Sequence, residues 1–460
     1  MELRVLLLVL VSYGIHALSE HHPGYRLELK QVDSYASGTL TRAKRLEKAL
    51  KTSKSRANFF SDRRKTSNSP TKSNNTRDRH SPELSSSIYQ AGGGEGEYMM
   101  ELSIGTPPQL IPAMIDTGSD LVWLKCDNCD HCDLDHHGET IFFSDASSSY
   151  KKLPCNSTHC SGMSSAGIGP RCEETCKYKY EYGDGSRTSG DVGSDRISFR
   201  SHGAGEDHRS FFDGFLFGCA RKLKGDWNFT QGLIGLGQKS HSLIQQLGDK
   251  LGYKFSYCLV SYDSPPSAKS FLFLGSSAAL RGHDVVSTPI LHGDHLDQTL
   301  YYVDLQSITI GGVPVVVYDK ESGHNTSVGP FLANKTVIDS GTTYTLLTPP
   351  VYEAMRKSIE EQVILPTLGN SAGLDLCFNS SGDTSYGFPS VTFYFANQVQ
   401  LVLPFENIFQ VTSRDVVCLS MDSSGGDLSI IGNMQQQNFH ILYDLVASQI
   451  SFQRVECENL

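Results

Sequence analysis

Short apolar runs, separated by turn residues, recur along the chain from about residue 91 onward. They include "EYMMELSIGTPPQ", "CKYKYEYGDGSRTSG", "FFDGFLFGCA", "FLFLG", "YYVDLQSITIGG", "SVTFYFA" and "SIIGNMQQQNFHILYDL". Regularly spaced short strands with glycine-rich turns predict a mostly β architecture. Helix-like stretches are few, and the clearest is "PPVYEAMRKSIEEQV", which has proline at its start.

The first 90 residues have a different pattern. Residues 1–19 carry a basic residue, an apolar core of secretory length and small residues at Ala17 and Ser19, which predicts a cleaved signal peptide. Within residues 20–90, "LTRAKRLEKALKTSKSRANFF" has apolar residues at helical spacing on a basic background. The polar segment that follows it reads as a linker or a disordered stretch. Residues 20–90 are therefore interpreted as a basic pro-region and linker.

Charge separates this front segment from the rest of the chain, whose formal net charge is -10. Residues 20–90 hold 15 Lys and Arg against 7 Asp and Glu, and residues 91–460 hold 24 against 42. A basic segment can be a solvated tail, a nucleic-acid arm or a pro-region. The signal peptide argues against nucleic acid, and a cationic segment covering an acidic cleft would be released as carboxylates become protonated.

These features, with those that follow, predict that the protein is exported from the cell's cytosol. No later segment reaches a membrane-spanning length, and the polar ending "FQRVECENL" argues against a lipid anchor. The expected destination is the extracellular space or apoplast, and the vacuole is also compatible. Twelve cysteines fit an oxidising compartment. Candidate glycosylation sites are the six Asn-x-Ser/Thr sequences at Asn74, Asn156, Asn228, Asn325, Asn334 and Asn379.

Two segments, "AMIDTGSDLVW" and "TVIDSGTTYTL", each place an aspartate in an apolar run before small residues. Each is followed downstream by an apolar-apolar-Gly sequence, "GLIGLG" and "SIIGN". This order occurs twice, which indicates a coarse internal duplication in which each lobe contributes one carboxylate. The alternative is two ordinary Asx turns, in which each aspartate bonds its own following backbone.

Two facing carboxylates suit acid–base hydrolysis. They cannot both ionise easily, so the pair shares a proton. The charged member can activate a water while the protonated member donates to a substrate carbonyl. Burial of an acid is costly unless it is hydrogen-bonded, and the hydroxyls of Ser119 and Thr342 are positioned in sequence to hold the outer oxygens.

These motifs, with the "YGDGS" turn, resemble the pepsin-like aspartic proteases of peptidase family A1. The segments "SDASSSYKKLPC", "FSYCL" and "IIGNMQQQNFHILYDL" resemble the plant nepenthesin-type subgroup, and the similarity runs from about Glu95 to Cys457. The resemblance implies a mostly β, bilobal fold with the active site in the cleft between two related β-barrel-like lobes. The expected lobes are residues 91–286, which hold Asp116, the cysteine-rich insert and a flap, and residues 287–460, which hold Asp339.

The resemblance also implies roles for individual residues. Asp116 and Asp339 would be the catalytic pair. Six neighbours would support them. Thr117 and Ser340 would link the two loops, and Gly118 and Gly341 would donate backbone hydrogen bonds. Ser119 and Thr342 would hold the outer carboxylate oxygens. Tyr182 and Gly183 would lie on a flap over the substrate, and Trp123 would hydrogen-bond the flap tyrosine.

The cysteine cluster "CDNCDHCDLDHH" has a metal-binding alternative, because Cys-x-x-Cys-x-x-Cys with His131, His136 and His137 nearby can hold zinc or an iron–sulfur cluster. No distant Cys-x-x-Cys completes a zinc pattern, so no metal and no cofactor is expected. The family resemblance implies six disulfides: Cys126–Cys129, Cys132–Cys219, Cys155–Cys176, Cys160–Cys172, Cys258–Cys457 and Cys377–Cys418.

The function that follows is a secreted aspartic endopeptidase, made as a zymogen and acting at acidic pH on polypeptides. The expected protein is a monomer without nucleic-acid or membrane partners, and its own pro-region is a candidate intramolecular inhibitor. The main alternative is a catalytically inactive pepsin-fold protein that binds or inhibits a partner. A storage or wall-structural protein is a third reading, and export alone favours it.

Overall fold

The computed structural model describes residues 22–31, 41–67, 96–130, 141–160, 171–172, 174–200, 209–225, 227, 230–265, 267–319, 323–381 and 387–460. Strand residues far outnumber helical residues among them, which confirms the mostly β prediction. The signal-peptide segment and residues 68–95 lie outside the described residues. Among the described residues, no helix combines the length and the apolar character that crossing a membrane requires.

A fifteen-stranded sheet joins the N-terminal half of the chain to strands from its C-terminal end. Its strands are β1 (Gly24–Gln31), β2 (Tyr98–Ile104), β3 (Gln109–Asp116), β4 (Trp123–Asp130), β5 (Lys151–Lys152), β6 (Arg171–Cys172), β7 (Cys176–Glu181), β8 (Arg187–Arg200), β9 (Arg209–Lys224), β10 (Gly232–Gly235), β11 (Lys254–Cys258), β12 (Ser270–Gly275), β13 (Val286–Pro289), β29 (Phe439–Asp444) and β30 (Gln449–Arg454). The strand β1 from the front segment lies between β12 and β2.

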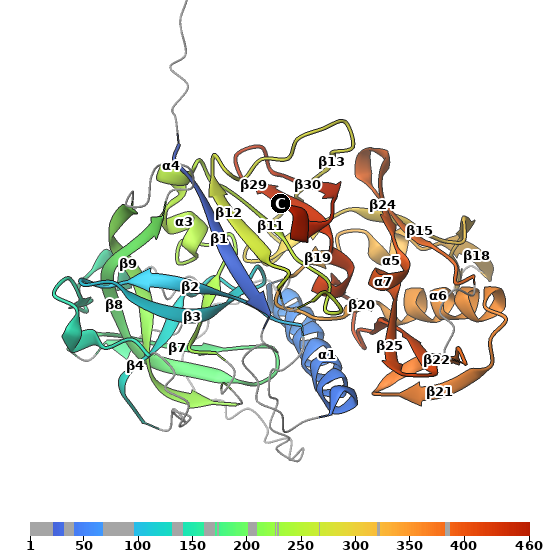
Figure 1. Ribbon diagram of the computed structural model, residues 1–460, viewed down its shortest axis with the longest axis horizontal. Coiled ribbons are helices and arrows are strands. Elements are labelled where there is room, and N and C mark those ends of the chain that lie inside the picture. Colours follow the sequence, from blue (N-terminus) through green and yellow to red (C-terminus); the bar gives the residue numbers. More distant parts are fainter. Residues whose placement is uncertain are drawn as a thin grey trace, which may run out of the picture.

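Four smaller sheets build the C-terminal half, at the right of Figure 1. The first contains β14 (Tyr301–Val303), β19 (Thr336–Ile338), β20 (Thr345–Leu347), β27 (Met421–Ser423) and β28 (Ser429–Ile431). The others are β15 (Leu305–Ile310), β16 (Val313–Pro314), β23 (Val391–Phe395) and β24 (Val399–Leu403); β17 (Val316–Asp319) and β18 (His324–Ser327); and β21 (Thr367–Ser371), β22 (Leu374–Asn379), β25 (Phe409–Ser413) and β26 (Val416–Leu419).

In the part of the chain that the structure describes, two helices are long and the others are short. The helices are α1 (Arg42–Ser67), α3 (Leu243–Gln246), α4 (Gly248–Leu251), α5 (Gly329–Leu332), α6 (Pro349–Gln362) and α7 (Phe405–Ile408), with 3-10 turns at Ser144–Ala146, Ala396–Gln398, Asn433–Gln436 and Cys457–Asn459. The helix α6 begins at Pro349, as "PPVYEAMRKSIEEQV" predicts, because proline fits the first helical turn. The helix α1 confirms the helix predicted in the basic segment.

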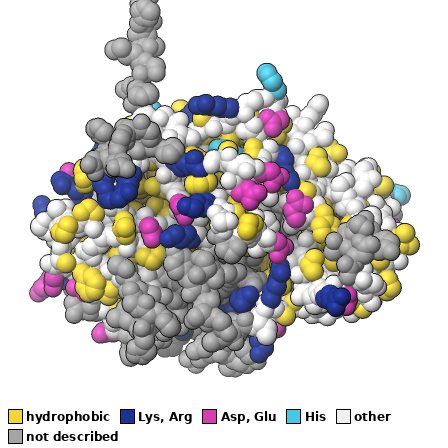
Figure 2. Space-filling model, viewed as in Figure 1, with side chains coloured by type: hydrophobic (Ala, Val, Ile, Leu, Met, Phe, Trp, Pro, Cys, Tyr) yellow, Lys and Arg dark blue, Asp and Glu magenta, His cyan; other side chains and the backbone are white. Residues whose placement is uncertain are grey.

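The helix α1 lies between the two halves of the molecule (Figure 1). Its apolar residues recur every three or four positions, so they share one face: Leu46, Ala49, Leu50, Ala57 and Phe60. This face packs into a buried cluster with residues of the C-terminal half, including Tyr344 and Leu346. Figure 2 shows Lys and Arg side chains beside Asp and Glu side chains along the boundary between the halves.

The disulfides differ from the expected pairing in the cysteine-rich region. The structure forms Cys258–Cys457 and Cys377–Cys418 as predicted. It also forms Cys126–Cys219 and Cys160–Cys176, so four predicted pairs are wrong: Cys126–Cys129, Cys132–Cys219, Cys155–Cys176 and Cys160–Cys172. The reason is strand register: β4 runs parallel to β9 with Leu124 opposite Cys219, which brings the Cys126 and Cys219 Cα atoms to 5.5 Å.

Cys129 and Cys155 are also disulfide-bonded. Cys132 and the Cys172 side chain lie outside the described residues. Of the candidate glycosylation sites, Asn156, Asn325 and Asn334 are exposed and Asn379 is half-buried, while Asn74 and Asn228 lie outside the described residues. Exposure permits modification at the first three positions, and glycosylation itself stays a prediction.

Candidate active site

The two aspartates end equivalent strands in the two halves. Asp116 is the last residue of β3, and β3 runs parallel to β10, the "GLIG" strand, with Gly235 opposite Asp116. Asp339 follows β19, which runs parallel to β28 with Ile338 opposite Ile431. The duplicated sequence order therefore has a structural meaning: each apolar-apolar-Gly strand supports the strand that delivers an aspartate.

The hydrogen bonds around the two carboxylates are nearly symmetric. Asp116 accepts the Gly118 N–H at 2.9 Å and the Ser119 hydroxyl at 2.5 Å. Asp339 accepts the Gly341 N–H at 3.0 Å and the Thr342 hydroxyl at 2.5 Å. Both carboxylates are fully buried. Each outer hydroxyl thus holds one carboxylate in place, which is the arrangement that the sequence predicts.

The loops that carry the aspartates are joined to one another. The Ser340 N–H donates to Thr117 Oγ1 at 2.8 Å, and the Thr117 N–H donates to Ser340 Oγ at 3.1 Å. This reciprocal pair of bonds fixes the two halves to each other at the site. The side chain of Asn433, in the 3-10 turn after β28, adds a bond from its amide to the Ser340 carbonyl at 2.9 Å.

Close packing explains the two glycines. A Cβ atom at Gly118 would lie 2.7 Å from Asp339 Oδ1, and one at Gly341 would collide with Asp116 Oδ1. Any side chain at either position would push the opposite aspartate away. Glycine is therefore required because each loop backbone approaches the other loop's carboxylate.

Tyr182 lines a pocket together with Arg56 and Gly341, and it contacts Trp123. Trp123 Nε1 donates to the Tyr182 hydroxyl at 2.7 Å, and both rings contact Trp227 edge-on. Tyr182 and Gly183 lie on the turn between β7 and β8, and the Tyr182 N–H donates to the Ser186 carbonyl. Burial raises the pKa of Tyr182 well above its ordinary value, so its hydroxyl stays neutral.

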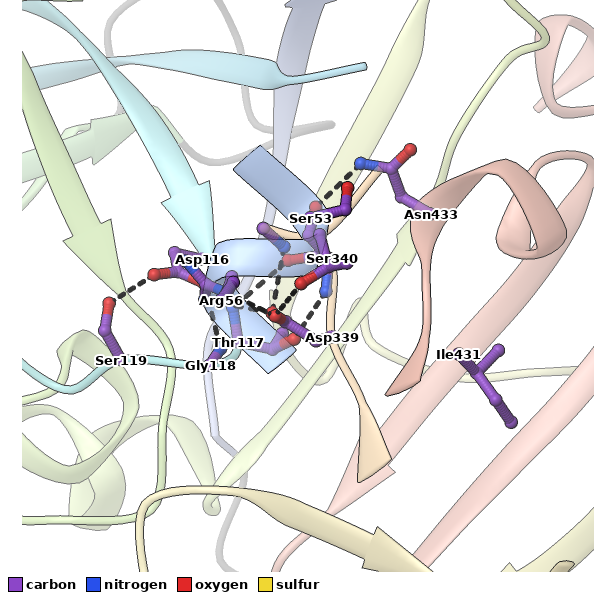
Figure 3. Close-up of polar contacts among 12 residues, drawn as sticks. Ser53, Arg56, Asp116, Thr117, Gly118, Ser119, Asp339, Ser340, Ile431 and Asn433 are labelled. Carbon is purple, nitrogen blue, oxygen red and sulfur yellow. Dashed lines mark hydrogen bonds and ion pairs between the residues drawn. The ribbon is translucent and has the colours of Figure 1, made fainter. Parts of the chain in front are cut away.

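Arg56 of α1 lies between the aspartates, as Figure 3 shows. Its Nε is 2.6 Å from Asp339 Oδ2, and its Nη2 contacts both Asp116 Oδ1 and, at 3.2 Å, Asp339 Oδ1. Only 8% of the Arg56 side chain is exposed. Burial opposes its charge, but the two carboxylates outweigh burial and raise the pKa of Arg56 above its ordinary value.

At Asp339, by contrast, burial decides the direction of the pKa change. It raises the pKa of this carboxyl, Arg56 opposes the change, and the charge of Asp116 adds to it. A buried charge needs a partner, and Arg56 supplies one positive charge for the pair. The sequence pattern did not single out Arg56 or Asn433. The basic helical segment was the available signal, but no motif distinguishes Arg56 from the other cations of that helix.

Among the described residues, further ion pairs connect α1 to acids of the body, including an exposed pair between Arg42 and Asp263. Lys54 lies 2.7 Å from Asp422, and Arg63 lies 2.8 Å from Asp297. Arg64 lies 3.5 Å from Asp427. Two of these acids are buried, since Asp297 and Asp422 are each only 4% exposed, and their pairing with Arg63 and Lys54 helps to hold the helix against the body.

No group of three or more His, Cys, Asp or Glu side chains is arranged to hold a metal ion within the part of the chain that the structure describes. His131, His136 and His137 lie outside that part.

Comparison with known proteins identifies the family. Residues 98–276 match the family model described as the xylanase inhibitor N-terminal domain, and residues 300–454 match the corresponding C-terminal domain. Aspartic proteinase nepenthesin-1 of Nepenthes gracilis is 36% identical, with 81% of this chain and 80% of that protein covered. Nepenthesin-2 of the same plant is 34% identical over 96% of this chain and 92% of that protein.

Solved structures share the fold. Basic 7S globulin from soybean has a TM-score of 0.62 and 24% identity, covering 81% of this chain and 96% of that chain. Conglutin gamma from lupine seeds also has a TM-score of 0.62, with 21% identity, 78% of this chain and 92% of that chain. The family models and the nepenthesin relatives show that the chain belongs to the pepsin-like aspartic proteinase family, peptidase family A1.

Proposed function

We propose that this protein is a secreted aspartic endopeptidase, made as a latent precursor, that hydrolyses peptide bonds at acidic pH. One observation carries the proposal: two buried carboxylates, held by matching hydrogen bonds, face the same guanidinium nitrogen. The proposed units are a signal peptide at residues 1–19, a pro-region and linker at 20–90, and lobes at 91–286 and 287–460.

The proposed chemistry uses Asp116 and Asp339 as one proton-sharing pair. When Arg56 leaves, two buried carboxylates without a cation cannot both stay charged, so one binds a proton. The ionised member then takes a proton from a water, and the protonated member donates to the carbonyl of the cleaved bond. Ser119 and Thr342 hold the outer oxygens throughout, which leaves the inner oxygens to face the substrate.

The flap supplies closure over the substrate in this proposal. Its tyrosine, Tyr182, is held by the Trp123 indole, and the neutral hydroxyl can accept that bond without competing for protons at working pH. A closed flap excludes water from the reacting groups and strengthens their electrostatic interactions. Polypeptides are the proposed substrates. The proposed enzyme is a monomer that needs no cofactor and binds no nucleic acid or membrane.

Latency is the second part of the proposal. Arg56 occupies the position that the attacking water needs, and the buried face of α1 fills the space between the halves. The pro-region thus acts as an intramolecular inhibitor. Protonation of the dyad at low pH weakens the attraction that holds Arg56, because a neutral carboxyl no longer attracts the guanidinium.

A second candidate function is a pepsin-fold protein that binds or inhibits a partner. The description of the matching family model, xylanase inhibitor, favours it. The intact acid–base set favours the protease, since a binding protein has no need for two buried, hydrogen-bonded aspartates.

The test is cleavage of a denatured protein by the purified full chain at about pH 4, where a shared carboxylate pair is singly protonated. We expect cleavage after a lag, and we expect both pepstatin and Asp116→Asn to abolish it. No cleavage after separation of residues 20–90 from the body would overturn the protease proposal and favour the binding protein.

A further inference from the structure

Two buried acids outside the dyad receive basic side chains from α1. Asp422, on β27, lies 2.7 Å from Lys54, and Asp297, in the loop before β14, lies 2.8 Å from Arg63. Both aspartates are 4% exposed, whereas the two cations are partly exposed, at 41% and 26%. The acids therefore belong to the body, and the cations are delivered to them by the helix.

The helix that delivers these cations also occupies the dyad. Lys54 precedes Arg56 by two residues and Arg63 follows it by seven. At about 1.5 Å of rise per residue, Lys54 and Arg63 are roughly 13 Å apart along the helix axis. An extended peptide covers that length with about four residues. A substrate strand that replaces α1 across the dyad can therefore reach both acids.

Departure of α1 removes Lys54 from Asp422 and Arg63 from Asp297. Lys239 still lies 3.3 Å from Asp297, but Asp422 has no second ion pair in the part of the chain that the structure describes. Burial raises the pKa of Asp422, and Lys54 opposes that effect. A buried carboxylate that loses its cation is unfavourable unless another cation replaces it. A lysine or arginine of a bound polypeptide is such a replacement.

We propose that Asp297 and Asp422 are specificity residues of the open cleft and select polypeptide substrates with Lys or Arg side chains at positions flanking the cleaved bond. This inference rests on the proposed function. The pro-region then resembles a substrate in its charge pattern, since its own lysine and arginine fill both acidic subsites while Arg56 blocks the reaction.

The test compares peptides that differ only by arginine or citrulline, which have nearly the same shape but different charge, placed at each position in turn. The protein is the full chain after acid processing, assayed at several pH values from about 4 to about 6.5, because burial raises the pKa of Asp422 above the ordinary aspartate value. We expect kcat/KM to be about 10-fold higher for arginine at the favoured positions, as for a charged hydrogen bond in a buried site.

Variants assign each preference to its acid. We expect Asp422→Asn and Asp297→Asn each to remove the arginine preference at one position, so that kcat/KM for the arginine peptide falls to that of the matching citrulline peptide, and to leave the preference at the other position. Asp294→Asn is the matched control, because Asp294 is exposed in the same loop as Asp297. Thermal unfolding of each variant verifies that it is folded.

Equal cleavage of arginine and citrulline peptides, or a preference that survives both substitutions, would overturn the inference and leave the protease proposal standing. If no peptide is cleaved, the protease proposal fails. The affinity of the processed protein for the same peptide pairs then decides the inference, and equal affinities overturn it.

Discussion

Arg56 Nε lies 2.6 Å from Asp339 Oδ2, although the two residues are 283 positions apart. The contact places a cation of the front segment inside the site that the duplicated aspartate motifs define. It also links the proposed latency to the charge of the dyad, because the same guanidinium contacts Asp116. Three hydrogen-bond contacts and near-complete burial make this the central interaction between α1 and the body.

Arg56→Met should shorten the lag before activity. The substitution leaves two buried carboxylates without their cation, which destabilises the docked helix by about 3–5 kcal/mol. We expect the full-length variant to begin cleaving substrate sooner than the wild-type protein at mildly acidic pH, measured with a quenched peptide. Lys44→Met, on an exposed position of the same helix, is the control and should not change the lag. Equal lags for both variants would show that Arg56 does not maintain latency.

The free energy of unfolding of the full chain should fall at low pH, partly because Asp297 becomes protonated and loses its ion pairs. Burial raises the pKa of this carboxyl, but Arg63 and Lys239 outweigh burial and lower its pKa below the ordinary value. The unfolded group titrates near about 3.9, so the stabilisation is fully present above that pH and is lost as the pH falls through the lower, folded-state pKa.

Denaturant unfolding at several pH values measures this effect. The comparison uses Asp116→Asn with and without Asp297→Asn, so that self-cleavage does not interfere under the proposed mechanism. Between neutral pH and the acidic end of the series, we expect the protein with Asp297→Asn to lose less of its free energy of unfolding than the protein without it. An unchanged pH dependence would contradict a role for this ion pair.

Thr117→Val should weaken the link between the two aspartate loops. The substitution keeps the side-chain shape but removes the acceptor of the Ser340 N–H, which leaves a buried donor unpaired. The expected cost is about 1–3 kcal/mol in the free energy of unfolding, with a lower kcat for the proposed reaction. The control is Thr367→Val, at an exposed position of β21. A loss of stability equal to that of the control would argue against the link.

Trp123→Phe should impair closure of the proposed flap over the substrate without unfolding the protein. It removes the N–H that donates to the Tyr182 hydroxyl at 2.7 Å. A net bond of this kind is worth about 0.5–1.5 kcal/mol, so kcat/KM should fall roughly two- to ten-fold. Tyr182→Phe removes the other partner and should give a similar loss, and the double variant should add little. Additive losses would show that the two residues act separately.

Peptide mapping without reduction should find Cys126 linked to Cys219. The structure places these cysteines on neighbouring parallel strands with bonded sulfurs, and it links Cys160 to Cys176. Mass spectrometry of the digested protein distinguishes this pattern from the alternative Cys126–Cys129 and Cys132–Cys219 pairs. Recovery of those alternative pairs would contradict the strand register described above.

The sequence determined the strand-rich fold, the helical character of the basic segment and the pairing of Asp116 with Asp339. These features are local or repeated: hydrophobic periodicity reports which face is buried, and a motif that occurs twice reports a shared site. The hydroxyls of Ser119 and Thr342 were predictable for the same reason, since they follow their aspartates by three residues.

Only the tertiary structure decided what the helix does. Periodicity predicts that α1 buries its apolar face, but it cannot say that Arg56 reaches the dyad or that Lys54 and Arg63 meet Asp422 and Asp297. Those contacts join residues hundreds of positions apart, and a cation carries no sign of its partner in its own neighbourhood. The pairing of Cys126 with Cys219 could not be predicted for a related reason. Strand register brings these two cysteines together, and spacing along the chain does not reveal that register.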